Sequence, residues 1–579
     1  MKKNIRYATL FFIVALFNCS CNKNTIFDDI ETNNVAEINN YISKNKDINL
    51  QNKEGLTPLM FAIKLHKNEI AKDLIKGGAN INGITKKGLT SLIVAIKYKN
   101  RDFISFLLKQ DVEVNSKLEE YPDALTIAAY YGDLDTAKLL LERNANINTF
   151  SKIKDEQRNG EIYASPIFIA IERKHLQLAN LLIEKGADAN ANSKIIINKP
   201  LRHINKIMKN IGLYVTKNKI FWDTINNYEE INTVENGIDN NDLFALNTGF
   251  SIEISPLQLA IMAGYDDIAL KLIKNGANVN DVGYDGSTPL FFAVQNDNSN
   301  ITTELIKAGA DINKKAIVGI TPLMVASQKG NIDIVKQLIK HGANINERAK
   351  DDRTALYFAV ANNHLGVIKI LIKEHANVNI DIAGVPLLIY AIQEKYYEAT
   401  EELIKNNADI DAATTEGITP LLVAIRNNDE KMIDLLIKYH INLNYISEKF
   451  GYPPVMLAFI MGNSKIINIM LDTGIDVNSK DKKRGVTLLM LASEKGDMAL
   501  VKKLISLHAN VNIRAKNQAT ALLVAIDKGH EEIVRELINA GADINTPFKK
   551  YGLTYSPLVY AHTRKNKNII DMLIKAGAK

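Results

Sequence analysis

Cysteine is almost absent from this chain of 579 residues. Its two cysteines, Cys19 and Cys21, stand close together near the amino terminus, and none follows them. The rest of the chain therefore has no residue that could form an internal disulfide bond or a thiolate metal site. We expect its folded part to be stabilised by packing alone.

An excess of one charge is also lacking. The chain has 71 lysines and arginines against 65 aspartates and glutamates, so its formal net charge is only +6. The two signs alternate along the chain, and there is no dense basic tract of the kind that neutralises nucleic-acid phosphates. We therefore expect no nucleic-acid partner.

The motifs of common reaction centres are missing too: no P-loop, no G-x-S-x-G turn and no H-E-x-x-H occurs. Asp409 and Asp411 fit turn formation better than paired catalytic carboxylates. Four recurring histidines fit capping of helix carbonyls better than a metal site, because none has a partner at short ligand spacing; they are His341, His375, His440 and His508. We expect no enzyme activity, cofactor, metal or small-molecule substrate.

What the sequence has instead is a short pattern that recurs about every 33 residues. It begins Thr57-Pro58-Leu59 in the first copy and Thr321-Pro322-Leu323 in a later one. Threonine can cap a helix, and proline suits the first helical turn. A repeat of this length is typical of stacked-repeat proteins.

An alanine stands five residues after the start of each of fourteen copies. A small side chain kept inside a helix indicates that another backbone comes close there. The fourteen are Ala62, Ala95, Ala128, Ala170, Ala260, Ala293, Ala326, Ala359, Ala391, Ala424, Ala458, Ala492, Ala525 and Ala561.

A second helix follows in every copy. A break such as Gly330-Asn331 separates it from the first helix, and an apolar pair such as Leu338-Ile339 lies on one of its faces. A segment such as Gly78-Ala79-Asn80-Ile81-Asn82 closes the unit. The pattern predicts a helix–turn–helix unit that buries its apolar side only against neighbouring copies.

These residues together resemble the ankyrin repeat, over roughly Ile30 to Lys579 apart from one insertion. The resemblance implies an all-α solenoid of about fourteen helix–turn–helix repeats, with projecting loops and a concave face that binds a partner protein. One departure is consistent: the histidine that usually follows Thr-Pro-Leu is replaced, mostly by apolar residues such as Met60 and Met324.

In ankyrin proteins, partners usually contact the projecting loops and the exposed end of the first helix. Carried over to this chain, that rule selects two groups of candidate partner-binding residues. Aromatic and methionine side chains at such positions are typical interface anchors, although partial burial under a neighbouring loop is an equal alternative. The candidates are Tyr98, Pro122, Tyr130 and Tyr131, and then Phe450, Tyr452, Ile460 and Met461.

The period breaks in the first half of the chain. We expect amino-terminal repeats over 33–190, with a half-repeat at their start, an insertion over 191–250, and carboxy-terminal repeats over 251–579. A polar extra loop is expected over residues 151–160. Within the insertion, apolar residues with helical spacing run from Leu201 to Ile211. They indicate a helix packed on the stack or a degenerate repeat. The alternative is a finger that contacts a partner.

Residues 1–21 are similar to a bacterial lipoprotein signal peptide. Lys2, Lys3 and Arg6 precede an apolar run that is too short to span a bilayer, and Leu16-Phe17-Asn18-Cys19 resembles a lipobox. Asn18 departs from the usual small residue, so Cys21 is the alternative site of acylation, and an ordinary export signal is a further alternative. Residues 22–32 would then be a short tether.

These features favour an exported protein of a bacterial envelope, held on the membrane by a lipid anchor, that binds another protein along its concave face. An envelope scaffold and a secreted effector that acts on host proteins are the alternatives.

Overall fold

The computed structural model describes residues 25–44, 46–86, 88–116, 121–155, 160–197, 250–283, 285–316, 319–550 and 553–579. Cys19 and Cys21 lie outside the described residues, and so does the apolar stripe expected within the insertion. The chain divides into two compact units, Met1–Ile317 and Val318–Lys579. Each unit is described by itself.

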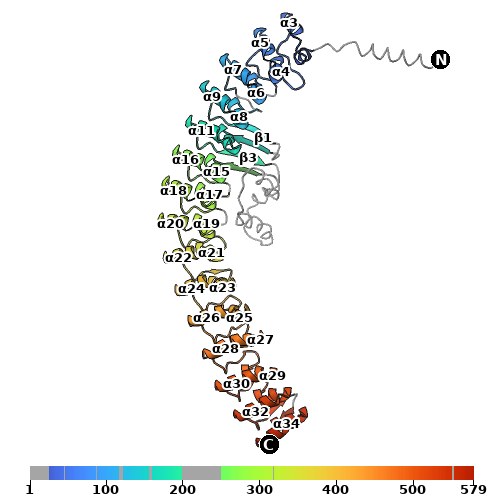
Figure 1. Ribbon diagram of the computed structural model, residues 1–579, viewed down its shortest axis with the longest axis vertical. Coiled ribbons are helices and arrows are strands. Elements are labelled where there is room, and N and C mark those ends of the chain that lie inside the picture. The colour runs from blue at the N-terminus through green and yellow to red at the C-terminus, as the bar shows by residue number, and fades with distance from the viewer. Residues whose placement is uncertain are drawn as a thin grey trace, which may run out of the picture. The chain divides into compact units, whose positions relative to one another are not determined.

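Unit 1 contains helix pairs in chain order (Figure 1). Their bounds are α2 Ile26–Glu31, α3 Val35–Ser43, α4 Pro58–Lys64, α5 Asn68–Lys76, α6 Ser91–Lys97, α7 Arg101–Lys109, α8 Ala124–Tyr131, α9 Leu134–Glu142, α10 Pro166–Glu172, α11 Leu176–Glu184, α15 Pro256–Met262, α16 Asp266–Lys274, α17 Pro289–Gln295 and α18 Ser299–Lys307.

Unit 2 continues the same alternation of a first and a second helix. The bounds are α19 Pro322–Lys329, α20 Ile332–Lys340, α21 Ala355–Ala361, α22 Leu365–Lys373, α23 Leu387–Gln393, α24 Tyr397–Lys405, α25 Pro420–Arg426, α26 Glu430–Lys438, α27 Pro454–Ile460, α28 Ser464–Asp472, α29 Leu488–Lys495, α30 Met498–Ser506, α31 Ala521–Lys528, α32 Glu531–Asn539, α33 Pro557–Arg564 and α34 Lys567–Lys575. From α4 onward the described residues form fourteen pairs, as the sequence predicts.

The repeat that begins at Thr321 shows why these residues form two helices. The Thr321 hydroxyl accepts a hydrogen bond from the Met324 backbone N–H at 3.3 Å, which caps α19. Gly330 ends that helix with a left-handed φ of 78°, a conformation that glycine adopts without steric cost. The Asn331 side chain then caps α20 through the N–H of Ile334 at 2.9 Å.

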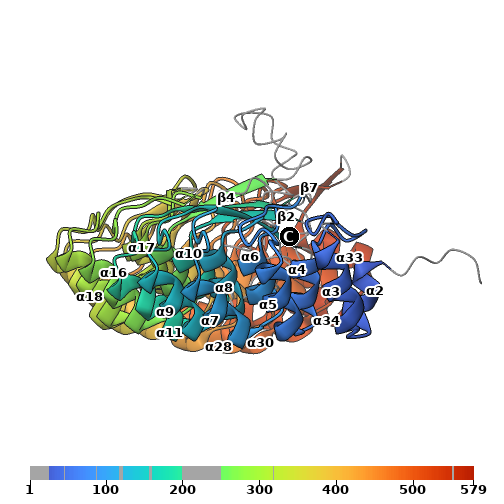
Figure 2. The same cartoon turned by 90° about the horizontal axis from the view of Figure 1, so that it is seen from above.

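The recurring alanines lie where the sequence places them, at the contacts between helices. Each of the fourteen has 0% exposure. In each unit, first helices pack on the first helices of neighbouring repeats, for example α4 on α6 and α29 on α31. Second helices form a separate layer, and the loops and strands lie beyond the first helices (Figure 2). The all-α repeat architecture is confirmed.

The first described helix pair corrects two expectations. Residues 26–31, expected within a tether, form α2, and the expected half-repeat therefore has a first helix as well as α3. Ile26 and Ile30 are 2% and 0% exposed, and α2 packs against α4. Asp28 caps the helix by accepting the Thr25 N–H at 2.7 Å. Two buried isoleucines on one face and this cap stabilise the helix. The helix is not evident from the sequence because most residues of the segment 22–32 are polar.

A four-stranded antiparallel sheet replaces the expected polar loop at residues 151–160. Its strands, in spatial order, are β1 Ser151–Asp155, β2 Gly160–Ala164, β3 Ser193–Ile197 and β4 Phe250–Ile254. Ile153 pairs with Ile162, which pairs with Ile195, and these side chains are 6%, 1% and 2% exposed. Alternate residues therefore face a buried side, as in a half-buried sheet.

The sheet also joins the two described ends of the insertion, because β3 pairs with β4. Next to it, α10 packs on α15 and α11 on α16. The repeats before and after the insertion therefore pack directly on each other within unit 1. Smaller hairpins, β5 Asp381–Ile382 with β6 Val385–Pro386 and β7 Phe548–Lys550 with β8 Leu553–Tyr555, occur in unit 2.

Of the four histidines predicted to cap helix carbonyls, His341 does so with its ring, which bonds the Gln337 carbonyl at 2.8 Å. The other three, His375, His440 and His508, have left-handed backbones just after a second helix, with φ of 66°, 63° and 61°. Asp409 accepts the N–H of Asp411 at 3.1 Å. Within the described part of the chain, no helix has the length and apolar character needed to cross a bilayer.

Candidate partner-binding site

The first group of sequence candidates forms one cluster at the ends of α6 and α8. Tyr98 caps the carboxyl end of α6, and Tyr131 is the last residue of α8. Because α6 packs against α8, the ends of these two helices are neighbours. The chain order thus brings aromatic side chains from consecutive repeats to one place.

Lys97 and Tyr121, which are not among the residues predicted from the sequence, connect this cluster. The Lys97 ammonium donates a hydrogen bond to the Tyr121 hydroxyl at 2.6 Å. It also lies 5.4 Å from the centre of the Tyr121 ring and 5.9 Å from that of Tyr98, within the range of cation–π attraction. Pro122 follows Tyr121 in the chain and is half-buried. We call Lys97, Tyr98, Tyr121, Tyr130 and Tyr131 the tyrosine cluster.

Tyr130 and Tyr131 have different environments within the tyrosine cluster. Their rings meet edge to face, with centroids 5.3 Å apart. The Arg173 guanidinium lies over the Tyr130 ring at 4.2 Å, so that tyrosine is half-buried between neighbours. Tyr131 is 37% exposed and has the Lys99 ammonium 5.8 Å from its ring centre. Tyr131 is therefore the better placed of the two for contact with a partner.

The electrostatics of the cluster keep its lysine charged. Burial acts to lower the pKa of Lys97, but the hydrogen bond to Tyr121 and the nearby Tyr98 and Tyr131 outweigh it and raise that pKa. Burial raises the pKa of Tyr131, which Lys97 partly opposes. At neutral pH Lys97 therefore keeps its charge beside the rings of the tyrosine cluster.

The second group of candidates is not brought together. Phe450 and Tyr452 precede α27, whereas Ile460 ends this helix and Met461 caps it. Helix α27, which begins after the first pair and ends with Ile460, is seven residues long, which corresponds to about 10 Å at 1.5 Å per residue. Phe450, Ile460 and Met461 are 46%, 59% and 47% exposed. Phe450 thus stands before the amino end of α27, while Ile460 and Met461 lie at its carboxyl end.

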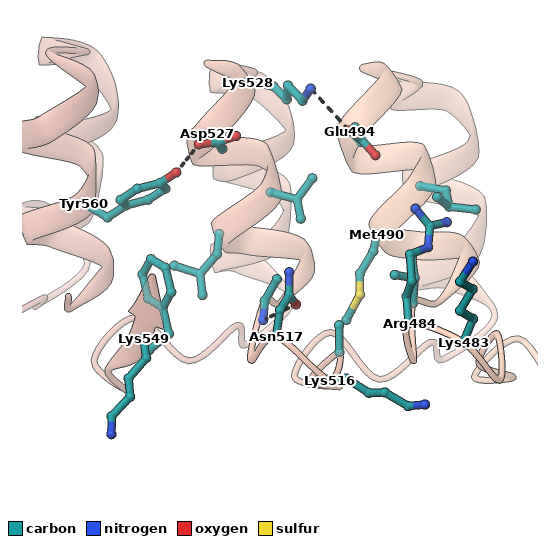
Figure 3. A pocket seen from close by; sticks show the side chains of 17 residues that line it. Lys483, Arg484, Met490, Glu494, Lys516, Asn517, Asp527, Lys528, Lys549 and Tyr560 are labelled. Atoms are coloured by element: carbon teal, nitrogen blue, oxygen red, sulfur yellow. Dashed lines mark hydrogen bonds and ion pairs between the residues drawn. The ribbon is translucent and has the colours of Figure 1, made fainter. Parts of the chain in front are cut away.

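Unit 2 also has a groove that is not among the sites predicted from the sequence. It has a volume of about 670 Å³ and is lined by residues of α29, α31 and α33 and of the loops that precede them. Figure 3 shows basic residues along one side of the groove, among them Lys483 and Lys516 of the loops and Lys549 of strand β7. The only signal in the sequence is the recurrence of lysine at intervals of 33 residues.

The chain belongs to the ankyrin-repeat family. The family model for three copies of the ankyrin repeat matches residues 30–118, 114–193, 227–316, 314–382, 388–481 and 489–579. No curated protein matches the chain. The solved structures that match include the ankyrin repeat domain of human ASB11, which is 24% identical, with a TM-score of 0.34 over 38% of this chain and 99% of that one. Ankyrin repeats are generally modules that bind other proteins.

Proposed function

We propose that this chain is an exported, lipid-anchored protein that captures another protein through the tyrosine cluster. The observation that carries the proposal is the exposed Tyr131 beside the charged, half-buried Lys97. Tyrosines supply large contact areas at a low cost in conformational entropy, and an adjacent cation adds affinity for carbonyl and carboxylate groups. Such anchors on a rigid helix row are typical of protein-binding surfaces.

The anchor is proposed on sequence grounds. The basic start, the short apolar run and the lipobox-like residues before Cys19 support export and acylation at that cysteine. One acyl chain gives only marginal membrane binding, so several are needed for stable attachment. A protein held in this way would offer its repeats to partners in a bacterial envelope.

The partner-binding proposal is tested by cross-linking and affinity capture from intact cells that make the protein. The double substitution Y98A/Y131A should reduce recovery of a stoichiometric partner about tenfold or more, because buried tyrosine anchors commonly contribute at least ~2 kcal/mol. The matched control is Y163A, since Tyr163 lies in the same unit and is 36% exposed. Equal recovery with Y98A/Y131A and Y163A would contradict the role of the cluster.

The anchor is tested by mass spectrometry of the mature amino terminus. We expect acyl chains on Cys19, absent in C19S and retained in C21S. The opposite pattern would place the anchor on Cys21, and an unmodified terminus in the soluble fraction would refute the anchor while leaving the binding test unaffected.

A further inference from the structure

The hairpin of β7 and β8 is attached to α33 by aromatic side chains. Phe548 is 6% exposed, and its ring lies edge to face with that of Tyr560, with centroids 5.1 Å apart. Phe548 pairs with Tyr555 across the hairpin, and their ring centroids are 5.9 Å apart. Figure 2 shows β7 on the side of the molecule where the loops lie, beyond the first helices. The base of the hairpin is therefore packed against α33.

An apolar side chain lies on the same face of the hairpin, farther from this base. Leu553 pairs with Lys550, two residues along from the pair of Phe548 and Tyr555. Because side chains alternate along a strand, Leu553 and Phe548 share one face. Phe548 is buried, whereas Leu553 is 60% exposed, the largest exposure among the large apolar side chains described. Leu553 is thus available to an apolar phase outside the protein.

Positive charge is concentrated around this leucine. Residues 479–485 and 513–518 precede α29 and α31, and residues 547–553 belong to the hairpin. Together these segments contain eight lysines and arginines and one acid, Asp481. That aspartate is 2% exposed and accepts a hydrogen bond from Arg484 Nε at 3.4 Å. A chain of small net charge thus gathers cations on the loop side of three repeats.

Three exposed lysines of these segments lack an acidic partner among the described residues. Lys483, Lys516 and Lys549 are exposed and line the same groove, so they are neighbours. Neither Lys483 nor Lys549 has an ion-pair partner there, and the Lys516 ammonium donates a hydrogen bond only to a backbone group, the Lys482 carbonyl, at 2.7 Å. We call four residues the loop-edge surface: Lys483, Lys516, Lys549 and Leu553.

The loop-edge surface does not enclose a compact ligand. The apolar side chains behind its lysines are buried, with Met490 and Leu523 at 3% and 5% exposure. Figure 3 shows Lys516 and Lys549 extending from the loop side, away from the helices and not towards each other. A small anion could therefore meet only one or two of the three lysines. A broad anionic surface could meet them all.

Exposed ammonium groups beside an exposed leucine match the surface of an anionic bilayer. Lysines are attracted to anionic headgroups, and an apolar side chain is stabilised when it leaves water for the acyl boundary. A nucleic acid would offer phosphates but no apolar phase for Leu553. An acidic peptide would offer carboxylates, but the apolar side chains behind the lysines are too buried to hold it. A lipid surface alone supplies a contact for both kinds of group.

We infer that the loop-edge surface docks unit 2 on an anionic lipid surface. Leu553 enters the boundary between headgroups and acyl chains, and the three lysines lie against the headgroups. This inference goes beyond the proposed function, because it involves neither the acylated cysteine nor the tyrosine cluster. Stable membrane attachment commonly combines an acyl anchor with a basic surface, so the two contacts would reinforce each other.

The charge contribution is tested by co-sedimentation of residues 22–579, made without acyl chains, with vesicles of equal parts phosphatidylglycerol and phosphatidylcholine. This chain contains every described residue. K483Q/K516Q/K549Q should lower the partition coefficient at least about tenfold, because each lysine near an anionic surface contributes about fivefold. Vesicles of phosphatidylcholine alone should bind the unaltered chain at least about tenfold more weakly.

The matched control for charge is K336Q/K369Q/K502Q, which removes three lysines from exposed positions on second helices of the same unit. It should bind the anionic vesicles within about twofold of the unaltered chain, because these lysines lie away from the loop side. Equal losses in the two triple variants would overturn the inference, since they would indicate diffuse charge attraction. Thermal unfolding of both variants checks that their folds are intact.

The insertion of Leu553 is tested separately. Residues 22–579 contain no cysteine, so L553C can be labelled alone with an environment-sensitive dye. Its fluorescence should rise with the anionic vesicles, because the dye leaves water. The matched control is V385C, since Val385 lies in another hairpin of unit 2 and is 37% exposed. No rise at L553C, or an equal rise at both positions, would overturn the inference.

Other anionic ligands are compared under the same conditions. Single-stranded DNA or polyglutamate that binds through the three lysines, when the anionic vesicles do not, would also overturn the inference. Its failure is distinguishable from that of the proposed function. Acylation is tested at Cys19 and partner capture at Tyr98 and Tyr131, and residues 22–579 without acyl chains bind vesicles, or fail to, independently of both.

Discussion

The side chain of Asn478 bonds the backbone of the next repeat: its Oδ1 accepts a hydrogen bond from the Asn510 N–H at 2.8 Å. Asn510 in turn accepts the N–H of Asn512 at 3.0 Å, and Asn512 accepts that of Asp543 at 2.7 Å. The same relationship joins other consecutive repeats, including Asn346 with Asn377 at 2.7 Å. Asparagine and aspartate side chains thus link the closing segments of neighbouring repeats.

We predict that N478A lowers the free energy of unfolding by about 1 kcal/mol, because the N–H of Asn510 loses its acceptor. The measurement is urea unfolding followed by circular dichroism. The matched control is N539A, an exposed asparagine near the end of α32, which should change stability by less than about 0.5 kcal/mol. Equal effects of the two substitutions would show that the link between repeats contributes nothing measurable.

A second prediction concerns glycines that face a histidine of the next repeat. Gly330 has a φ of +78°, and a Cβ added there would lie 2.6 Å from His364 Nδ1. The His364 ring is held in place by a hydrogen bond between Nε2 and the Gln328 carbonyl at 2.8 Å. G330A should therefore destabilise both through backbone strain and through a clash, by about 2 kcal/mol or more in total.

The control for G330A is G342A, because Gly342 has a φ of +91° and no atom within 4 Å of an added Cβ. G342A should cost about 1 kcal/mol from strain alone. In a double-mutant cycle measured by calorimetry, G330A/H364A should cost less than the sum of the single changes. Additive effects would indicate that the glycine and the histidine do not interact.

Much of the fold is predictable from the sequence because each repeat carries the same local signals. Thr321, Pro322 and Gly330 mark the bounds of a helix by themselves. The equivalent residues of the other repeats predict the same helix, so each repeat supports the prediction for the others. Helix α2 is not predicted from the sequence because it depends on the burial of Ile26 and Ile30, and this burial depends on packing against α4. The strand β1 is not predicted from the sequence because Lys152 and Lys154 stand on either side of its one buried isoleucine, Ile153, so that the segment reads as a polar loop.

The candidate site is less predictable, because its contacts join residues of different repeats. Tyr98 and Tyr131 are recognisable from their positions in the repeat, but the bond between Lys97 and Tyr121 depends on the path of the intervening loop. The groove of unit 2 cannot be predicted from the sequence for a related reason. Its lining residues are dispersed in the sequence, and stacking of the repeats brings them together.

The third prediction is a pH dependence at Glu401. Hydrogen bonds from Lys438 and Tyr439, each at 2.8 Å, and a further interaction with Lys405 lower the pKa of Glu401 from its usual 4.5 to about 2. A carboxyl with a lowered pKa in the folded state stabilises the fold fully above the unfolded value. That stabilisation is lost progressively as the pH falls from about 4.5 towards 2.

E401Q should therefore be slightly less stable than the unaltered protein at pH 7, and the difference should shrink as the pH falls from about 4.5 towards 2, because Glu401 then begins to take up a proton in the folded state as well. Urea midpoints measured across this range test the prediction. E398Q is the matched control, since Glu398 is an exposed residue of the same helix, without an ion-pair partner among the described residues. It should show no such trend. A difference between E401Q and the unaltered protein that stays constant down to pH 2 would assign the contribution of Glu401 to its packing rather than to its charge.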